Sequence, residues 1–189
     1  HSVTHSFPTR RSSDLKVIMP NAGERIDIYL PYINDYADAF NINTPLRMAH
    51  FLAQVAHETA ELVHIREIGN ADYCHKYEVG RLAKMLGNTQ KGDGYRYKGR
   101  GFLHLTGRAN YQAYTNSKYC KGNVVEEPKL LEQPRGAVKS GMWYWLTRGL
   151  NAVADKNNIE AVTKKINGGT NGLASRTKYW KRALRAFNI

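Results

Sequence analysis

The sequence has little of what several specialised protein classes need. Two cysteines among 189 residues exclude a fold built on disulfide bonds. The longest apolar-rich stretch, residues 48–56, is interrupted by His50 and Gln54 and falls short of the roughly 18 apolar residues of a membrane-spanning helix. Hydrophobic residues make up 42% and charged residues 23% of the chain, which is the balance of a globular protein with a buried core. We therefore expect a folded domain without stable membrane insertion.

Acidic residues are scarce relative to basic ones, and the formal net charge is +12. The charge is also uneven: residues 24–72 carry a net −5, residues 91–108 carry +4, and residues 164–189 carry +7 with no acidic residue. This asymmetry favours an anionic polymer as the partner. Nucleic acid, an acidic cell wall and a membrane surface all meet that description, and a basic face that is merely solvated is the alternative.

Residues 1–15 lack the periodicity of a helix or a strand and are rich in serine, threonine and arginine. We expect this segment to be disordered. Residues 5–15, HSFPTRRSSDL, resemble a translated sequencing adapter, which predicts that the segment is an artefact and that the true start of the protein is missing. Without the segment the net charge is +11, and residues 16–189 are expected to form a single domain.

Helix signals dominate the rest of the chain. Thr44 and Pro45 are typical of an N-cap and a first helical residue, and the helix that follows is apolar nearly all round, so we expect it to be central and buried. Pro31 is predicted to lie in the first turn of a helix over residues 32–40. Further helices are expected over residues 78–86, 106–117, 134–146, 159–166 and 173–187, with Thr106 capping the second of these. Residues 95–98 and 102–105 are predicted to form two short strands of one small β-hairpin or sheet, so the fold class is mainly α, of α+β type.

Glu58 is the most informative single residue because it ends this apolar helix. Carboxylates are rarely buried without a partner, and desolvation favours the protonated form that a general acid needs. A structural ion pair with an arginine is the alternative. Glu67 follows nine residues later, which on one continuous helix puts the two side chains on opposite faces. If the chain doubles back after Glu58, two facing carboxylates provide the equipment for glycoside hydrolysis.

A metal site is a weaker interpretation of the same region. His50, His57 and His64 are spaced seven residues apart, and Glu61 follows His57 by four, so one side of an extended helix would gather four ligands. However, the sequence HETAE is not the HExxH pattern of a zinc hydrolase. We therefore expect no metal. The pairing of Cys74 and Cys120 is open, with free thiols slightly favoured.

Residues 92–111, GDGYRYKGRGFLHLTGRANY, combine glycines, tyrosines and arginines. Aromatic rings beside hydrogen-bonding side chains suit sugar rings, and the same mixture suits single-stranded nucleic acid. A hairpin with a solvated basic edge is the alternative that involves no ligand.

Three segments together, in this order, resemble glycoside hydrolase family 19, the chitinase and phage-endolysin family of the lysozyme superfamily. AHFLAQVAHET (49–59) resembles its catalytic helix, YKGRGFLHLTGRANY (97–111) its central motif, and KKINGGTNGLASR (164–176) its C-terminal motif. The resemblance implies that residues 16–189 form one catalytic domain with two mainly helical lobes flanking a substrate cleft. It implies no cofactor.

The resemblance also implies roles for individual residues. Glu58 matches the general acid, Glu67 the general base, and Glu78 is a second candidate for the base. The residues expected to bind substrate, position water or order the acids are Tyr97, His104, Thr106, Asn110, Asn167 and Arg176. His104 stands where the family usually has glutamine. HETAE replaces the more common HETGG, so Glu61 adds a charge near the acid.

The implied reaction is inverting endo-hydrolysis of β-1,4 bonds in N-acetylhexosamine polymers, which requires carboxyl groups about 6.5–9.5 Å apart. Chitin is neutral whereas peptidoglycan is largely anionic, so the +11 charge favours peptidoglycan, with chitin as the alternative. We expect a monomer of bacterial or phage origin that acts on the cell wall and has no nucleic-acid partner. A non-catalytic, basic nucleic-acid-binding protein is the different-class alternative, but it gives no reason for the Glu58 and Glu67 pair.

Overall fold

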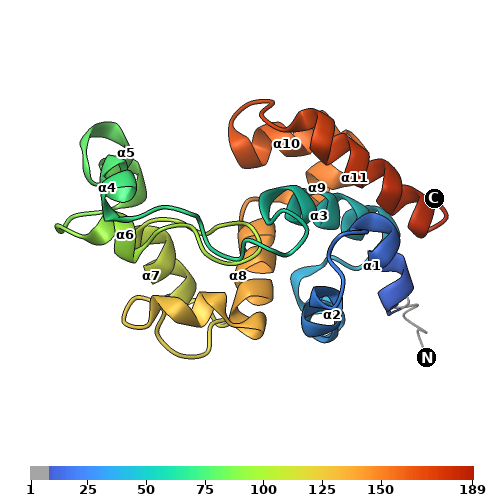
Figure 1. Ribbon diagram of the computed structural model, residues 1–189, viewed down its shortest axis with the longest axis horizontal. Helices are drawn as coiled ribbons and strands as arrows, with labels where there is room; N and C mark the ends of the chain where they lie inside the picture. Colours follow the sequence, from blue (N-terminus) through green and yellow to red (C-terminus); the bar gives the residue numbers. More distant parts are fainter. Residues whose placement is uncertain (1–8) are drawn as a thin grey trace. The chain divides into compact units, whose positions relative to one another are not determined.

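The structure, a computed structural model, describes residues 9–189 (Figure 1). Helix accounts for 61% of the chain and strand for 2%, so the prediction of a mainly helical fold is confirmed. The chain divides into two compact units. Of the described residues, unit 1 contains residues 9–63 together with Trp145–Ile189, and unit 2 is His64–Tyr144.

Unit 1 is built around α3 (Pro45–Glu58), along which α11 (Leu173–Ala186) packs (Figure 1). The other helices of this unit are α1 (Ser12–Ile18), α2 (Arg25–Tyr36), η1 (Asp38–Phe40), α9 (Leu150–Ala154) and α10 (Ile159–Asn167). As predicted, Thr44 caps α3, because its Oγ1 accepts the Arg47 N–H at 3.1 Å, and Pro45 is the first helical residue. Every residue from 48 to 56 is buried, so α3 is the core helix of unit 1 and ends at Glu58 with its position fixed.

The expectation that residues 1–15 stay outside the fold is wrong for the part that the structure describes. Residues 1–8 lie outside the described residues. The Arg10 N–H donates to Asn34 at 2.9 Å, and the Arg11 N–H donates to Asp14 at 3.0 Å at the start of α1. Leu15 and Ile18, three residues apart on α1, are fully buried. This apolar pair begins within the segment, so the folded region starts before residue 16.

Pro31 also departs from its predicted position. It lies inside α2, which begins at Arg25 rather than at residue 32. Ile26, Tyr29 and Ile33 are the buried residues of this helix, and their i, i+3, i+7 spacing forms one apolar face. Burial of that face outweighs the one backbone hydrogen bond that a proline removes.

Unit 2 consists of short helices around an aromatic core. Its elements are α4 (Ala71–Cys74), η2 (His75–Glu78), α5 (Gly80–Leu86), α6 (Asp93–Arg96), α7 (Arg108–Asn116), η3 (Pro128–Glu132) and most of α8 (Pro134–Thr147). Tyr97 and Tyr111 are both buried and meet edge to face, with ring centroids 5.0 Å apart. The predicted start of a helix at Pro134 is confirmed.

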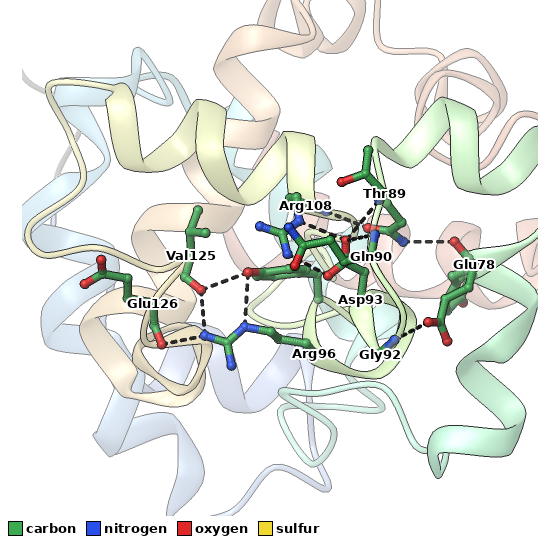
Figure 2. Close-up of polar contacts among 12 residues, drawn as sticks. Glu78, Thr89, Gln90, Gly92, Asp93, Arg96, Arg108, Val125 and Glu126 are labelled. Atoms are coloured by element: carbon green, nitrogen blue, oxygen red, sulfur yellow. Dashed lines mark hydrogen bonds and ion pairs between the residues drawn. The ribbon is translucent and has the colours of Figure 1, made fainter.

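The predicted β-hairpin is reduced to single bridges, Arg66 with Arg100 and Arg100 with Leu105. The segment expected to be its first strand turns into α6 because Asp93 gathers donors from both sides (Figure 2). Its carboxylate accepts the N–H groups of Thr89 and Gln90, each at 3.0 Å, and pairs with Arg108 at 2.7 Å. The hydrogen bonds of this one charged side chain therefore decide the backbone of residues 93–96.

The start of α7 differs from the prediction by two residues. Thr106 does not cap it; its Oγ1 donates to the His104 carbonyl at 2.7 Å, and the helix begins at Arg108 after Gly107. Gly107 has φ 96°, a conformation that favours glycine.

Cys74 is buried, Cys120 is partly exposed, and both are free thiols. Among the helices of residues 9–189, none is long and apolar enough to span a membrane.

Candidate active site

The carboxylate of Glu58 lies at the end of α3 and meets an arginine from α11. Its Oε1 is 2.7 Å from Nη1 of Arg176. The Glu58 side chain is 23% exposed, whereas that of Arg176 is 3% exposed. A buried guanidinium group therefore contacts a carboxylate that still reaches solvent. This one contact is the ion pair considered for Glu58, and it is also the contact through which Arg176 could orient the acid.

Arg176 is itself fixed by neutral partners. Its Nη1 donates to Oε1 of Gln54 at 2.5 Å, and its Nε donates to the Asn171 carbonyl at 3.1 Å. Asn167, the last residue of α10, donates to the same carbonyl at 3.4 Å. Gln54 is fully buried one turn before Glu58. The role of Gln54 was not predicted, although a lone amide four positions before Glu58 in an apolar helix is the signal for it.

The turn after Glu58 has an uncommon backbone. Ala60, Glu61 and Leu62 have φ of 47°, 58° and 69°. Each of these left-handed conformations costs a non-glycine residue roughly 1–2 kcal/mol. The side chain of Thr59 secures the turn by donating to the Val55 carbonyl at 2.7 Å and accepting the Leu62 N–H at 2.8 Å. The glycines of the more common HETGG fit this backbone without such a cost.

Glu61 anchors the same turn through its carboxylate, and the residue is only 5% exposed. It accepts the Asn21 N–H at 2.6 Å, the Asn21 side-chain amide at 3.3 Å and the Tyr179 hydroxyl at 2.9 Å. Burial, followed by the hydrogen bond to Glu61, raises the pKa of Tyr179 to about 12. Tyr179 follows Arg176 by three residues on α11, so one helix contacts both Glu58 and Glu61.

Two of the three histidines considered as metal ligands have other partners. His57 Nδ1 lies 2.9 Å from the Ser175 hydroxyl, and His50 Nε2 lies 3.0 Å from the Asn157 side chain. Burial lowers the pKa of both imidazoles, and nearby Arg176 lowers that of His57 further. Residues 9–189 contain no group of three or more histidine, cysteine, aspartate or glutamate side chains placed to hold a metal ion.

Glu67 lies in unit 2, where both of its carboxylate oxygens accept hydrogen bonds. Tyr77 donates its hydroxyl to Oε1 at 2.6 Å, and the Gly99 N–H donates to Oε2 at 3.2 Å. The Glu67 backbone N–H in turn donates to the Gly99 carbonyl at 2.7 Å. Burial and the bond to Glu67 raise the pKa of Tyr77, so its hydroxyl stays a donor. Both oxygens of Glu67 therefore act as hydrogen-bond acceptors, which fixes the orientation of the carboxyl group.

Three residues of the central motif gather next to Gly99. A Cβ at Gly99 would lie 2.9 Å from the His104 Cβ and 3.2 Å from the Thr106 hydroxyl, which explains why glycine stands there. Asn110 donates to the Thr106 carbonyl at 2.7 Å, and His104 Nε2 lies 2.9 Å from the His64 carbonyl. The structure therefore brings His104, Thr106 and Asn110 together near the backbone that contacts Glu67.

Tyr97 does not have the predicted placement. It is 1% exposed, and its hydroxyl donates to the Val125 carbonyl at 3.0 Å. Arg96 donates to the same carbonyl and to that of Glu126, at 3.0 and 2.9 Å. Tyr97 is thus a core residue of unit 2 that ties α6 to residues 125–126, and the prediction that it contacts substrate is corrected.

Glu78, the second candidate for the base, is occupied by its own loop. Its carboxylate accepts the Gly92 N–H (Figure 2). The other carboxylate oxygen lies 3.5 Å from Nδ1 of His75. The contact with Gly92 holds the start of α6. Hydrogen bonds therefore hold both Glu67 and Glu78, and the assignment of the base to Glu67 stays a prediction.

The predicted residues separate by unit. Glu58, Asn167 and Arg176 come together in unit 1. Glu67, His104, Thr106 and Asn110 come together in unit 2. Tyr77 and Tyr179, which hold the carboxylates of Glu67 and Glu61, carried no signal in the sequence.

Comparison with known proteins gives matches over most of the chain. A sequence model of the family described as "Chitinase class I" matches residues 34–170. A protein of Haemophilus influenzae named "Glycosyl hydrolase family 19 domain-containing protein" is 31% identical over 164 residues, covering 74% of this chain and 79% of that protein. Chitinase 4 of Oryza sativa subsp. japonica is 27% identical over 161 residues, covering 80% of this chain and 53% of that protein. The chain thus spans about half the length of the rice chitinase.

Solved structures share the fold. Chitinase C from Streptomyces griseus HUT6037 superposes with a TM-score of 0.75 at 21% identity, covering 99% of this chain and 96% of that one. A class IV chitinase from Zea mays gives a TM-score of 0.69 at 20% identity, covering 96% of this chain and 94% of that one.

Proposed function

Since this chain belongs to glycoside hydrolase family 19 and is a glycoside hydrolase, we propose that it cleaves β-1,4 bonds within N-acetylhexosamine polymers and inverts the configuration at the anomeric carbon. The proposal assigns one proton transfer to each of two carboxyl groups, Glu58 and Glu67. Neither step requires a metal or an organic cofactor.

Glu58 is proposed as the general acid. The observation that carries this role is the 2.7 Å contact with Arg176, which fixes the carboxyl group from behind while 23% of the Glu58 side chain remains exposed. In the reaction the protonated Glu58 gives its proton to the glycosidic oxygen as the bond from that oxygen to the anomeric carbon breaks. The leaving sugar departs with a new hydroxyl group.

Glu67 is proposed as the general base. It takes a proton from a water molecule whose oxygen bonds to the anomeric carbon on the face opposite the leaving group. The hydrogen bonds from Tyr77 and Gly99 keep the carboxylate oriented. Thr106, whose hydroxyl group lies near Gly99, is proposed to help hold the water. After turnover Glu58 is ionised and Glu67 protonated, and exchange with solvent restores the starting state.

Peptidoglycan is the proposed substrate, and the bacterial cell wall the proposed site of action of a monomeric enzyme. The excess of basic residues supports this choice, since residues 16–189 carry a net +11 and peptidoglycan is largely anionic. A positive field raises the local concentration of an anionic polymer and the rate of encounter with it.

Chitin is the second candidate, and the names of the relatives favour it. The rice relative is named a chitinase, as are the Streptomyces and maize proteins of similar structure. Chitin shares the β-1,4 linkage between N-acetylhexosamines, so the same two carboxyl groups would serve.

Product analysis on both polymers tests the proposal. Purified peptidoglycan sacculi and a chitin hexamer are each incubated with the enzyme and with its Glu58→Gln variant, and the soluble products are identified by mass spectrometry. We expect reducing muropeptides from the sacculi at a higher rate than fragments from the hexamer, and neither from the variant. Products from the hexamer alone would assign the enzyme to chitin, and products from neither polymer would contradict the proposed activity.

A further inference from the structure

The solvent-facing side of α11 carries an uninterrupted row of cations. Lys178, Lys181, Arg182 and Arg185 occupy i, i+3, i+4 and i+7, which places them on one face of the helix. They line a groove of about 510 Å³, completed by Ala174 and Thr177. Because α11 contains no acidic residue, nothing on the helix itself balances these charges.

The four cations also lack acidic partners from elsewhere. Among residues 9–189, none of them forms an ion pair. On the neighbouring α10, by contrast, Lys164 pairs with Glu160 at 2.6 Å. Like charges four residues apart destabilise a helix by some tenths of a kcal/mol per pair. Repulsion among these cations therefore destabilises the folded protein, and a bound anion would relieve that repulsion.

The inward side of the same helix holds the candidate acid. Arg176 and Ala183 are the buried residues of α11, and Arg176 contacts Glu58. Arg185 follows Arg176 by nine residues, about 14 Å along a helix. A polymer held in the groove would thus lie on the element that positions Glu58.

We propose that this groove on α11 binds the carboxylate groups of peptidoglycan and holds the enzyme on the insoluble wall during successive cleavages. The inference rests on the proposed function for the identity of the polymer. The positive charge of the groove favours an anionic ligand. The residues that line the groove indicate which class of anionic ligand it suits. The groove contains no aromatic ring for stacking nucleobases. No large apolar residue of α11 is exposed for insertion into a lipid interface. A hydrophilic polyanion satisfies both conditions.

Two matched triple variants test the proposal. Lys178→Gln, Lys181→Gln and Arg185→Gln together neutralise the groove and leave Arg182, which lies over the ring of Tyr179. The control neutralises three other exposed lysines, Lys84, Lys91 and Lys156, so both proteins lose the same charge. Co-sedimentation with purified sacculi is measured at low salt and at about 0.5 M NaCl, where screening suppresses exposed charge interactions. Turnover of a neutral chitin hexamer is measured in parallel.

We expect the groove variant to bind sacculi about tenfold more weakly at low salt, given about 0.2–1 kcal/mol for each exposed charge contact. The control should bind nearly as the parent does, the difference should vanish at high salt, and all three proteins should cleave the hexamer equally. An equal loss of affinity for sacculi in both variants, or no loss in either, would contradict the proposal that the groove binds the wall. So would a groove variant that cleaves the hexamer poorly, because the cations would then be structural. Tighter binding of the parent to anionic lipid vesicles or single-stranded DNA than to sacculi would contradict peptidoglycan as the ligand of the groove.

The two proposals fail separately. Sacculi that bind through the groove but release no product would contradict the proposed substrate and leave the groove intact. Sacculi that are cleaved at the same rate by parent and groove variant, with the same affinity, would contradict the groove alone.

Discussion

Arg176 and Glu58, 118 residues apart in the chain, are joined by a 2.7 Å ion pair in which only the carboxylate reaches solvent. The arginine comes from the first turn of α11 and the glutamate from the last residue of α3. Gln54 completes the contact from one turn earlier on α3. The position of the candidate acid therefore depends on the packing of two helices, and changes to that packing should appear in catalysis.

Replacement of Arg176 by alanine should lower kcat more than it raises KM, because Glu58 loses the group that orients it. The same change leaves the buried Gln54 carbonyl without its donor, which costs about 1–3 kcal/mol. Arg176→Lys keeps the charge but not the planar set of donors. Its kcat and its free energy of unfolding should lie between those of the parent and those of Arg176→Ala. Steady-state kinetics and urea unfolding measure the two effects. An Arg176→Ala enzyme with the parent's kcat would show that the contact is only structural.

Glycine substitutions in the turn at residues 60–62 should offset part of the stability that is lost when the Glu61 side chain is removed. Glu61→Ala removes the anchor to Asn21 and Tyr179 but keeps the left-handed backbone, so the free energy of unfolding should fall by about 1–3 kcal/mol. The double variant Ala60→Gly and Glu61→Gly also loses the anchor, yet it relieves roughly 1–2 kcal/mol of backbone cost per residue. Urea unfolding should therefore rank the double variant above Glu61→Ala. The reverse order would contradict the account of Glu61 as the residue that holds this turn.

Acidification should destabilise unit 1 through the buried His50 and the half-buried His57. The pKa of His57 is lowered by burial and by Arg176, and that of His50 is lowered by burial. Below the ordinary histidine pKa of about 6.5, the unfolded chain binds a proton at each histidine more readily than the folded protein does. The contribution of the two histidines to the free energy of unfolding is therefore fully present above about pH 6.5, and it is lost as the pH falls toward their lowered pKa values in the folded protein. Urea midpoints for the parent and for His57→Asn at about pH 7.5 and about pH 5.5 measure the effect. The variant should lose less stability between them, and an identical loss would remove His57 from the explanation.

Glutamine substitutions should separate the three carboxyl groups. Glu58→Gln and Glu67→Gln should each lower kcat by about 10²–10⁴-fold, the usual contribution of a general acid or base, while near-native unfolding curves show that the fold survives. Glu78→Gln should act mainly on stability, because its carboxylate holds the Gly92 N–H. A Glu78→Gln enzyme that is inactive beside a nearly normal Glu67→Gln enzyme would reverse the assignment of the base.

Local signals in the sequence predicted the framework better than the contacts within it. Thr44 and Pro45 were sufficient to begin α3, and its apolar surface placed the helix in the core. The hairpin prediction failed because the pairing of Asp93 with Arg108, fifteen residues apart, decided the local backbone. Glu58 and Glu67 stood out by position and motif. Gln54 carried a signal as a lone amide one turn before Glu58, whereas Tyr77 and Tyr179 could not be found from periodicity, because their roles arise only when the folded chain brings them to a carboxylate.

The anomeric configuration of the first product tests the central claim most directly. Proton NMR during the first minutes of chitin hexamer cleavage, before mutarotation equilibrates the anomers, reports which face of the sugar the water attacked. Activation of water by Glu67 opposite the bond that Glu58 protonates predicts that the new reducing end appears first as the α anomer. A product that appears first as the β anomer would mean retention through a glycosyl intermediate and would contradict the roles assigned to both glutamates.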